Sequence, residues 1–514
     1  MPKPRFSRLL ASAIGLALAF SAVSAGADVL LQHVQVYDGT GAAPFAADVR
    51  VRGTKIVAVA PQLAPEPGET VSDQQGLALA PGFIDAHSHA DAGLFDDLDA
   101  ATVSRQGVTT VVVGQDGESV FPMAAYRARL QATPPAINVA SFAGHATLRM
   151  QVMGKDLYRP STPAEQARME ALLQQEMLDG AFGLSTGLEY EQGHFATTEE
   201  VVALSKVAAA HHGTYLSHVR DESNKVFESF DEVLRIGREA RIPVGITHIK
   251  MGATSVWHQA AKRMPAYFAQ AKREGVKLTP DVYPYTYWHS TIRVVVPDRD
   301  FFNAAKVAQA LEENGGAGAI RFASYAPDPA LAGKTLAEMA AHWGITPVEA
   351  YMRTIRETEP EVDSGKAMED IIGTSMSEDD VSWFVAHPDI AFCSDGALHG
   401  AHPRGAGAFP RILGHYVREA KVLSLPEAIR KMTSLPAGRL GLADRGRIAP
   451  GFVADLVLFD PATVIDQSTI QHPEAPPLGI PAVMVSGEWV IRDGAVTGKR
   501  PGQALQGPGY RAAR

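Results

Sequence analysis

The feature that most constrains the fold is a regular alternation of short apolar runs and longer helix-like segments through most of the chain. The runs are rich in β-branched residues, and each is long enough for one buried strand. Strands that alternate with helices form parallel sheets. We therefore predict an α/β fold, a (β/α)₈ TIM-like barrel, with strands in VTTVVVG (108–114), AINVASFAG (136–144), GTYLSHVR (213–220), IPVGITHIK (242–250), VKLTPDVYPY (276–285) and IAFCSDG (390–396).

The clearest helix is predicted for TPAEQARMEALLQQEMLDGA, residues 162–181. Thr162 is followed three residues later by Glu165, the pattern of a capping box, and Gly180 lies near the end. The alternation is interrupted from about residue 297 to 375. There we expect an inserted helical subdomain.

Both ends of the chain are different from the middle. Residues 28–81 and 441–514 contain short alternating segments that are broken by Asp-Gly and Arg-Gly turns, which is typical of small antiparallel strands. We predict a small β-sandwich domain formed by both termini, with residues 82–440 forming the catalytic barrel. The C-terminal part ends in a tail.

The first 27 residues have the pattern of a signal peptide. Basic residues precede an apolar run, LLASAIGLALAF, that is too short to span a bilayer, and Ala25-Gly26-Ala27 fits a cleavage site. The sequence thus predicts an exported protein, periplasmic in a Gram-negative source. The single cysteine, Cys393, excludes an intramolecular disulfide and a Cys₄ zinc site.

The formal net charge of −10 comes without any Lys/Arg run. This composition argues against a nucleic-acid partner or an anionic membrane, because both require basic patches.

Ionisable side chains gather where the predicted strands end, which is where barrel enzymes carry their chemistry. His87 and His89 form a His-x-His pair, and alternate residues of an extended strand point the same way. A lone strand histidine is more often a hydrogen-bonded core residue. Here, however, four histidines and several acids share the predicted barrel edge: His87, His89, Asp116, Glu118, His218, His248 and Asp395.

Burying so many ionisable groups without a cation is costly. The pattern therefore predicts a metal centre with nitrogen and oxygen ligands, a set that suits zinc. Zinc polarises a carbonyl and activates water, and a nearby carboxylate can move the proton to a leaving amine. We assign that carboxylate to Asp395 and expect hydrolysis of an amide or related C–N bond.

These motifs resemble the amidohydrolase superfamily and, more narrowly, its N-acyl-D-amino-acid deacylases (D-aminoacylases). The resemblance covers nearly the whole chain after the signal peptide. It rests on PGFIDAHSH (81–89), GHATLR (144–149), GAFGLSTGLEYEQG (180–193), SHVRDE (217–222), THIK (247–250), DVYPY (281–285), MSEDD (376–380), HPRGAGAFPRILGHYVRE (402–419) and GRIAPGFVADLVLFD (446–460).

The resemblance implies a zinc-dependent hydrolase that cleaves N-acyl-D-amino acids to a D-amino acid and a carboxylate. It implies one tightly bound zinc ion held by His218 and His248, and a weaker second position lined by His87, His89 and Asp395. Asp395 would be the proton shuttle.

One motif departs from the family pattern. Where the family carries GNCG, with a cysteine that ligates zinc, this chain reads GQDG, which puts Asp116 in the place of the cysteine. A carboxylate can ligate or bridge zinc ions. Glu118 is the competing candidate for the same role, and we place Asp116 first.

Substrate-binding residues follow partly from spacing and partly from the resemblance. Lys250 lies two residues after His248, on the same face of an extended strand. The resemblance adds four further candidates around the substrate: Tyr190, Tyr283, Ser290 and Arg293.

Three alternatives stay open. A dipeptidase for D-residue or isopeptide-linked dipeptides would use the same chemistry. Cyclic amidases bridge two metals with a carboxylated lysine, and the chain has no lysine between Lys55 and Lys155, which disfavours them. A non-catalytic metal-binding barrel is the third alternative. The sequence leaves open the oligomeric state, the number of metal ions and the preferred acyl and side-chain groups.

Overall fold

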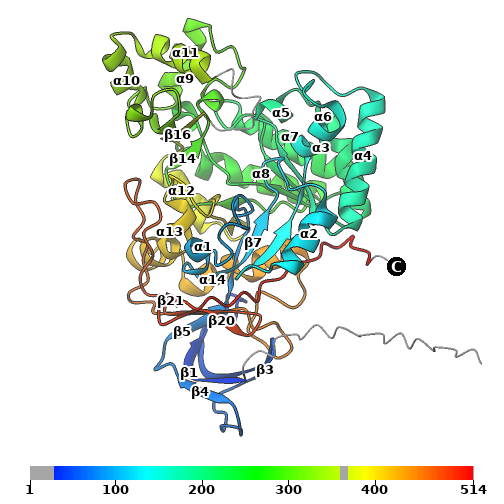
Figure 1. Cartoon of the computed structure of the whole chain (residues 1–514), viewed down its shortest axis with the longest axis vertical. Helices are drawn as coiled ribbons and strands as arrows, with labels where there is room; N and C mark the ends of the chain where they lie inside the picture. The colour runs from blue at the N-terminus through cyan, green and yellow to red at the C-terminus, as the bar shows by residue number, and fades with distance from the viewer. Residues whose placement is uncertain (1–27, 359–367, 513–514) are drawn as a thin grey trace, which may run out of the picture.

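The computed structural model describes residues 28–358 and 368–512 (Figure 1). The predicted signal peptide lies outside the described residues. Within these ranges, no helix is both long enough and apolar enough to cross a bilayer.

The centre of the molecule is a closed ring of parallel strands. Its members, in order, are β6 (Phe83–Asp85), β7 (Val108–Val113), β8 and β9 (Asn138–Ser141 and Ala143–Gly144), β10 (Gly183–Gly187), β11 (Thr214–His218), β12 (Val244–Ile246), β13 (Asp281–Val282) and β17 (Ala391–Phe392). Neighbours pair in parallel, and a single bridge between Val244 and Leu278 joins β12 to the segment before β13.

The ring closes between β17 and β6. The amide of Ala86 donates to the carbonyl of Phe392 (3.3 Å), and the amide of Asp395 donates to the carbonyl of His87 (2.9 Å). With β8 and β9 sharing one position, eight strand positions complete the barrel. The predicted (β/α)₈ barrel is confirmed.

Helices surround the barrel because the crossovers between parallel strands need them. The predicted helix is α4, which begins at a complete Thr162/Glu165 capping box and ends at Leu178. The outer helices are α1 (Ala101–Ser104), α2 (Met123–Ala132), α3 (His145–Met153), α4 (Pro163–Leu178), α5 (Glu191–His194), α6 (Thr198–Ala210), α7 (Val226–Ala240), α8 (Ala260–Glu274), α12 (Glu378–Ala386), α13 (Arg404–Arg411), α14 (Leu425–Met432) and α15 (Ser434–Leu440).

Strands from the two ends of the chain join in one nine-stranded sheet. Its halves meet where β5 pairs antiparallel with β18. The sheet has its own apolar core and lies at the lower end of Figure 1. Its strands are β1 (Val29–Val36), β2 (Phe45–Arg52), β3 (Lys55–Ala60), β4 (Thr70–Asp73), β5 (Ala78–Pro81), β18 (Leu456–Phe459), β19 (Ala482–Val485), β20 (Glu488–Arg492) and β21 (Ala495–Val496).

A third unit, which we call the insertion, separates β13 from β17. Its antiparallel sheet has the order β14-β16-β15, and it packs with helices around a separate apolar core. The sequence predicted helices here but not this sheet, which begins at Tyr287. The elements are β14 (Tyr287–Ser290), α9 (Ala304–Glu313), β15 (Arg321–Tyr325), α10 (Leu336–Trp343), α11 (Pro347–Thr358) and β16 (Glu369–Thr374).

Candidate metal centre

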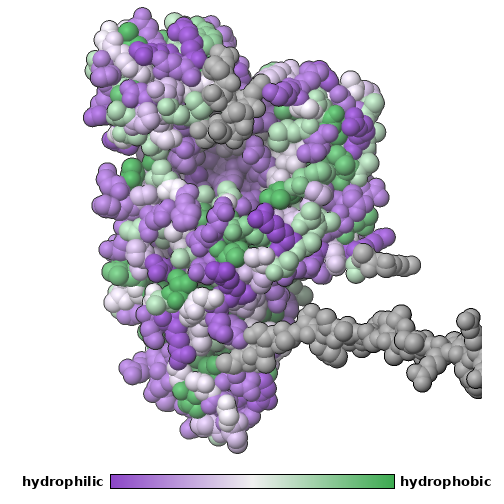
Figure 2. All heavy atoms as spheres, viewed as in Figure 1, coloured by the Kyte–Doolittle hydropathy of each residue, from purple (hydrophilic) through white to green (hydrophobic). Residues whose placement is uncertain are grey.

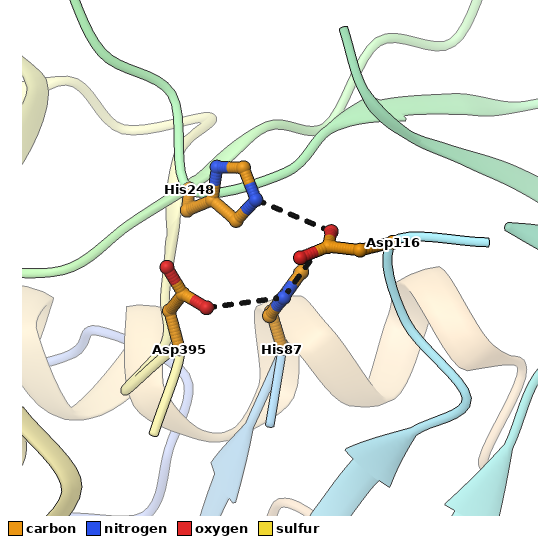
Figure 3. A group of neighbouring side chains, drawn as sticks. All are labelled: His87, Asp116, His248 and Asp395. Carbon is orange, nitrogen blue, oxygen red and sulfur yellow. Dashed lines mark hydrogen bonds and ion pairs between the residues drawn. The ribbon is translucent and has the colours of Figure 1, made fainter. Parts of the chain in front are cut away.

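Four buried side chains meet at the carboxyl end of the barrel (Figure 3). His87 follows β6, Asp116 follows β7, His248 follows β12 and Asp395 follows β17. One ligand atom from each lies within 4.8 Å of all the others. Segments far apart in the sequence thus place two imidazoles and two carboxylates around one point.

The contacts within this group are short. Oδ1 of Asp116 lies 3.2 Å from Nε2 of His248 and 3.5 Å from Nε2 of His87. Oδ1 of Asp395 lies 3.4 Å from the same His87 nitrogen. His89 closes the group from its more open side, because its Nε2 lies 3.3 Å from Oδ2 of Asp116 and 3.3 Å from Oδ1 of Asp395.

A second group shares His248 with the first. It consists of His218, Glu222 and His248, again with ligand atoms within 4.8 Å. Nδ1 of His218, the last residue of β11, lies 3.1 Å from Nε2 of His248. Glu189 lies on the other side of this ring, with Oε2 3.0 Å from Nε2 of His218. All six residues that the sequence predicted as metal ligands therefore lie at one end of the barrel.

Backbone strain marks the same place. Asp116, His248 and Asp395 have φ angles of +54°, +34° and +50°. Side chains other than glycine seldom adopt this left-handed region, and each such residue costs about 1–3 kcal/mol. Strain of this kind is concentrated at functional sites. The three turns aim their side chains inward instead of continuing the strands.

The electrostatics of the group favour paired charges. Burial alone raises the pKa of Asp116, but His87 and His248 hold that pKa well below its usual range. Burial likewise opposes ionisation of Asp395, whose pKa is held low by Arg404 and His248. Burial and Lys250 lower the pKa of His248, yet Asp395, Asp116 and Glu222 raise it to about 10. Ionised carboxylates thus favour a positive charge on the imidazole that faces them.

These residues fit a divalent metal ion. Nε2 of His87 faces Nε2 of His89 at 3.4 Å, and Nδ1 of His218 faces Nε2 of His248 at 3.1 Å. Two imidazole nitrogens that face each other can share only one proton per contact, whereas a cation accepts lone pairs from several nitrogens and oxygens at once. Imidazole and carboxylate ligands suit zinc and other first-row divalent ions.

The two groups of potential metal ligands lie at a cavity of about 250 Å³. Three predicted substrate-binding residues, Lys250, Tyr190 and Ser290, line it. Lys250 is buried, and its Nζ lies 2.7 Å from both carboxylate oxygens of Glu222 and 2.7 Å from Nδ1 of His248. The Tyr190 ring lies 4.5 Å from the His218 ring.

The other two predicted substrate residues, Tyr283 and Arg293, are not among those that line the cavity. Tyr283 is fully buried behind the pocket wall, where its ring lies beneath Lys250 and Arg404, with centroid distances of 5.8 and 4.9 Å. Arg293 is buried and does not line the cavity, and its Nη1 lies 3.2 Å from Oε1 of Glu191 in α5. The sequence did not reveal this pairing, because Glu191 lies far away in sequence, and the assignment of Arg293 to the substrate stays a prediction.

Two other side chains with metal-binding chemistry, those of Glu118 and Cys393, differ from Asp116 in their surroundings. Glu118 has an exposed side chain, whereas Asp116 is buried among the histidines. Cys393 is a free, buried thiol, and burial first and then Asp281 raise its pKa. It therefore behaves as a small core residue.

Among the pocket residues that were not predicted, three carry a carboxylate or guanidinium group that contacts a predicted site residue: Glu189, Glu222 and Arg404. Nη1 of Arg404 lies 2.6 Å from Oδ2 of Asp395. Glu222 follows His218 by four residues in SHVRDE, a run that reads as a solvated turn. The motif contained the signal, since an acid beside a predicted ligand is a common partner of it.

Comparison with known proteins is consistent along nearly the whole chain. Residues 70–491 match the sequence profile of the amidohydrolase family. A D-aminoacylase of Alcaligenes xylosoxydans xylosoxydans is 36% identical over 506 residues, covering 93% of this chain and 97% of the relative. An N-acyl-D-glutamate deacylase of the same organism is 35% identical over 503 residues, covering 93% and 96%.

A solved structure shares the fold. The N-acyl-D-glutamate deacylase from Bordetella bronchiseptica, crystallised with zinc and a phosphonate inhibitor that mimics the tetrahedral intermediate, has a TM-score of 0.83 and 34% sequence identity. The match covers 94% of this chain and 100% of that one.

Proposed function

The chain belongs to the N-acyl-D-amino-acid deacylases of the amidohydrolase family, and we propose that it hydrolyses N-acyl-D-amino acids with zinc as its metal. The products are a D-amino acid and a carboxylate. The observation that carries this proposal is the convergence of four imidazoles and two carboxylates on the open end of the barrel, inside a pocket that also contains a buried lysine.

We assign the metal ligands to His87, His89, Asp116, His218, His248 and Asp395. Asp116 is central to this assignment, since its two oxygens face His248 on one side and His89 on the other. It therefore suits a bridging role between two ligand groups. A zinc ion held there would polarise the amide carbonyl and lower the pKa of bound water.

Asp395 is assigned as the group that moves the proton. Its Oδ2 is held by Arg404 and its Oδ1 faces His87 and His89, so the carboxylate is fixed at the floor of the pocket. In hydrolysis it takes a proton from the attacking water. It then gives that proton to the leaving nitrogen as the C–N bond breaks.

Substrate orientation is assigned to Lys250, Tyr190 and Ser290. An ammonium group and hydroxyls in a buried pocket are the donors that an α-carboxylate requires. Glu222 holds Lys250 in place through both of its oxygens. The proposed partner is the small-molecule N-acyl-D-amino acid substrate.

Export is part of the proposal. The basic, apolar and small-residue segments of residues 1–27 support cleavage before Asp28. A metal centre without cysteine ligands suits an oxidising periplasm, where free thiols are at risk of oxidation.

The test is metal content by mass spectrometry on the purified mature protein, with wild type beside Asp116→Ala. N-acetyl-D- and N-acetyl-L-amino acids are assayed on the same samples. We expect zinc in the wild type, depletion in the variant and release from D-substrates alone. Glu118→Ala is the matched control and should retain its metal. A wild type without metal and without amide release would overturn the proposal.

A further inference from the structure

Two parts of the molecule form the substrate pocket. The barrel supplies the floor with the metal-type residues, and the insertion supplies an outer wall made of Trp288, His289, Ser290, Val294 and Asn314. Figure 2 shows a hollow between the insertion, at the top of the view, and the barrel below it, and the surface inside this hollow is hydrophilic. A bound substrate would therefore lie between a floor of charged side chains and a wall that contains neither acidic side chains nor lysine or arginine.

The cations of the pocket are already paired. Apart from histidines, the positively charged residues among those that line it are Lys250 and Arg404. Lys250 is held by both oxygens of Glu222, and Arg404 by Asp395. Any carboxylate of a substrate must share one of these two groups with a protein carboxylate.

The acids of the pocket outnumber its cations. Asp116, Glu189, Glu222 and Asp395 line it, against the two cations. A single divalent metal ion held by these residues would balance the two excess negative charges. One α-carboxylate then already gives the occupied pocket a net negative charge, and a second carboxylate increases the repulsion.

The outer wall offers no compensation among the described residues that line the pocket. Its side chains are an indole, an imidazole, a hydroxyl, an isopropyl group and an amide. Burial and then Arg404 lower the pKa of His289, which keeps this imidazole neutral. Arg293, the cation nearest in sequence, is not among the residues that line the pocket, and its Nη1 pairs with Glu191, while its buried Nε and Nη2 have no hydrogen-bond partner among the described residues.

We propose that the substrate carries a single carboxylate, so that both the D-amino-acid side chain and the acyl group are uncharged. This inference rests on the proposed deacylase function and narrows it. Overall similarity does not decide the matter, because a D-aminoacylase and an N-acyl-D-glutamate deacylase are 36% and 35% identical to this chain. The charge distribution of the pocket favours the single carboxylate, since burying a second carboxylate without a cation is strongly disfavoured.

Isosteric substrates test the inference directly. N-acetyl-D-glutamine and N-acetyl-D-glutamate have nearly the same shape and differ in charge, and kcat/KM for the amide should be at least about tenfold higher. For the acyl group, N-succinamoyl-D-leucine and N-succinyl-D-leucine form the corresponding pair. Equal or higher kcat/KM for the charged member of either pair would overturn the inference.

A cation added to the outer wall should reverse the preference. Val294 is partly exposed and lines the pocket, so Val294→Lys places an ammonium group beside the substrate. We expect the amide-to-acid ratio of kcat/KM to fall at least about fivefold in one of the two pairs. Val294→Met, similar in length but uncharged, is the matched control and should keep the wild-type ratio. A ratio that does not change in Val294→Lys contradicts the charge argument.

The outcome separates this inference from the proposed function. Release from N-acetyl-D-leucine together with equal use of glutamine and glutamate derivatives would overturn the single-carboxylate inference alone. No release from any N-acyl-D-amino acid by the zinc-loaded protein would overturn both. Zinc content is measured on every variant, so that loss of metal is not read as a change of preference.

Discussion

At the scale of single residues, Asp116 is the most informative position in the chain. It occupies the place where the family pattern has a cysteine, and its carboxylate lies between His248 and His89. Its left-handed backbone shows that the loop is shaped to present this side chain. As the proposed ligand, its hard carboxylate oxygen in place of a soft thiolate would change which metals the site prefers.

We predict that Asp116→Asn lowers zinc affinity by at least about tenfold, because the neutral amide loses the charge that attracts the ion. Asp116→Cys should keep zinc and bind Mn²⁺ less well than the wild type, since manganese prefers oxygen ligands. Competitive loading with equimolar zinc and manganese, followed by mass spectrometry, measures both effects. Unchanged zinc-to-manganese ratios in both variants would show that residue 116 is not a ligand.

Lys431 gives a prediction about pH far from the pocket. It is fully buried, donates to the carbonyl of Val385 and lies 4.5 Å from the centre of the Phe392 ring. Burial lowers its pKa from 10.5 to about 7. Between about pH 7 and pH 10 the unfolded chain holds a proton that the folded chain lacks, so this group makes stability rise with pH. Below pH 7 both states are protonated and the full penalty applies.

The expected consequence is that Lys431→Met stabilises the protein at pH 6 by about 1–3 kcal/mol and by less at pH 9. The gain at low pH is the relieved burial of a charge, reduced by the lost hydrogen bond to Val385. Denaturant unfolding at the two pH values gives the difference. Lys272→Met, at an exposed position in α8, is the control and should show the same change at both values.

The residue scale also shows what sequence can and cannot predict. His87 and His89 were predictable because the spacing of a strand fixes their relative direction. The roles of Glu189 and Arg404 were not, because each depends on a partner, His218 or Asp395, that only the closed barrel brings near. The pairing of Arg293 was not predictable for the same reason, since Glu191 lies 102 residues earlier.

At the scale of elements, glycines at strand ends allow the backbone of a neighbouring loop to approach closely, because they carry no side chain. Gly187 ends β10, and a Cβ atom there would lie 2.2 Å from the carbonyl oxygen of Asp116.

The barrel could be predicted from the alternation of strands and helices, because local periodicity in the sequence determines where strands and helices form. The insertion's sheet was not predicted, because β14 reaches its partner β16 only through a long excursion of the chain.

We predict that Gly187→Ala shifts the Asp116 loop and lowers zinc affinity by at least about tenfold, with a loss of about 1–3 kcal/mol in stability. Metal titration and denaturant unfolding of the variant measure these two effects. Gly438→Ala is the matched control, because this glycine lies within α15 with open space around the added methyl group. The control should be neutral or slightly stabilising. Wild-type zinc affinity in Gly187→Ala would mean that the loop position does not set the site.

At the scale of the whole molecule, one buried network joins the terminal sheet, the barrel and the C-terminal tail. Asp455, just before β18, accepts from Asn138 at the start of β8 (3.1 Å) and pairs with Arg445. Arg445 donates to the side-chain oxygen of Gln503 in the tail (2.9 Å), and the backbone amide of Gln503 donates to Oδ1 of Asn138 (3.1 Å). The network lies at the amino end of the barrel strands, whereas the metal-type residues lie at the carboxyl end.

Removing one member should therefore separate stability from function. Asp455→Ala leaves Arg445 buried without its carboxylate, and we expect a loss of about 3–5 kcal/mol with zinc content unchanged in the folded protein. Asp444→Ala, which breaks an exposed pair with Lys55, is the control and should cost less than about 1 kcal/mol. Calorimetry distinguishes two outcomes for Asp455→Ala. A single lowered transition means that sheet, barrel and tail still unfold as one unit without the intact network, whereas two transitions, where the wild type shows one, would mean that the network couples them. An unchanged transition temperature would contradict the prediction.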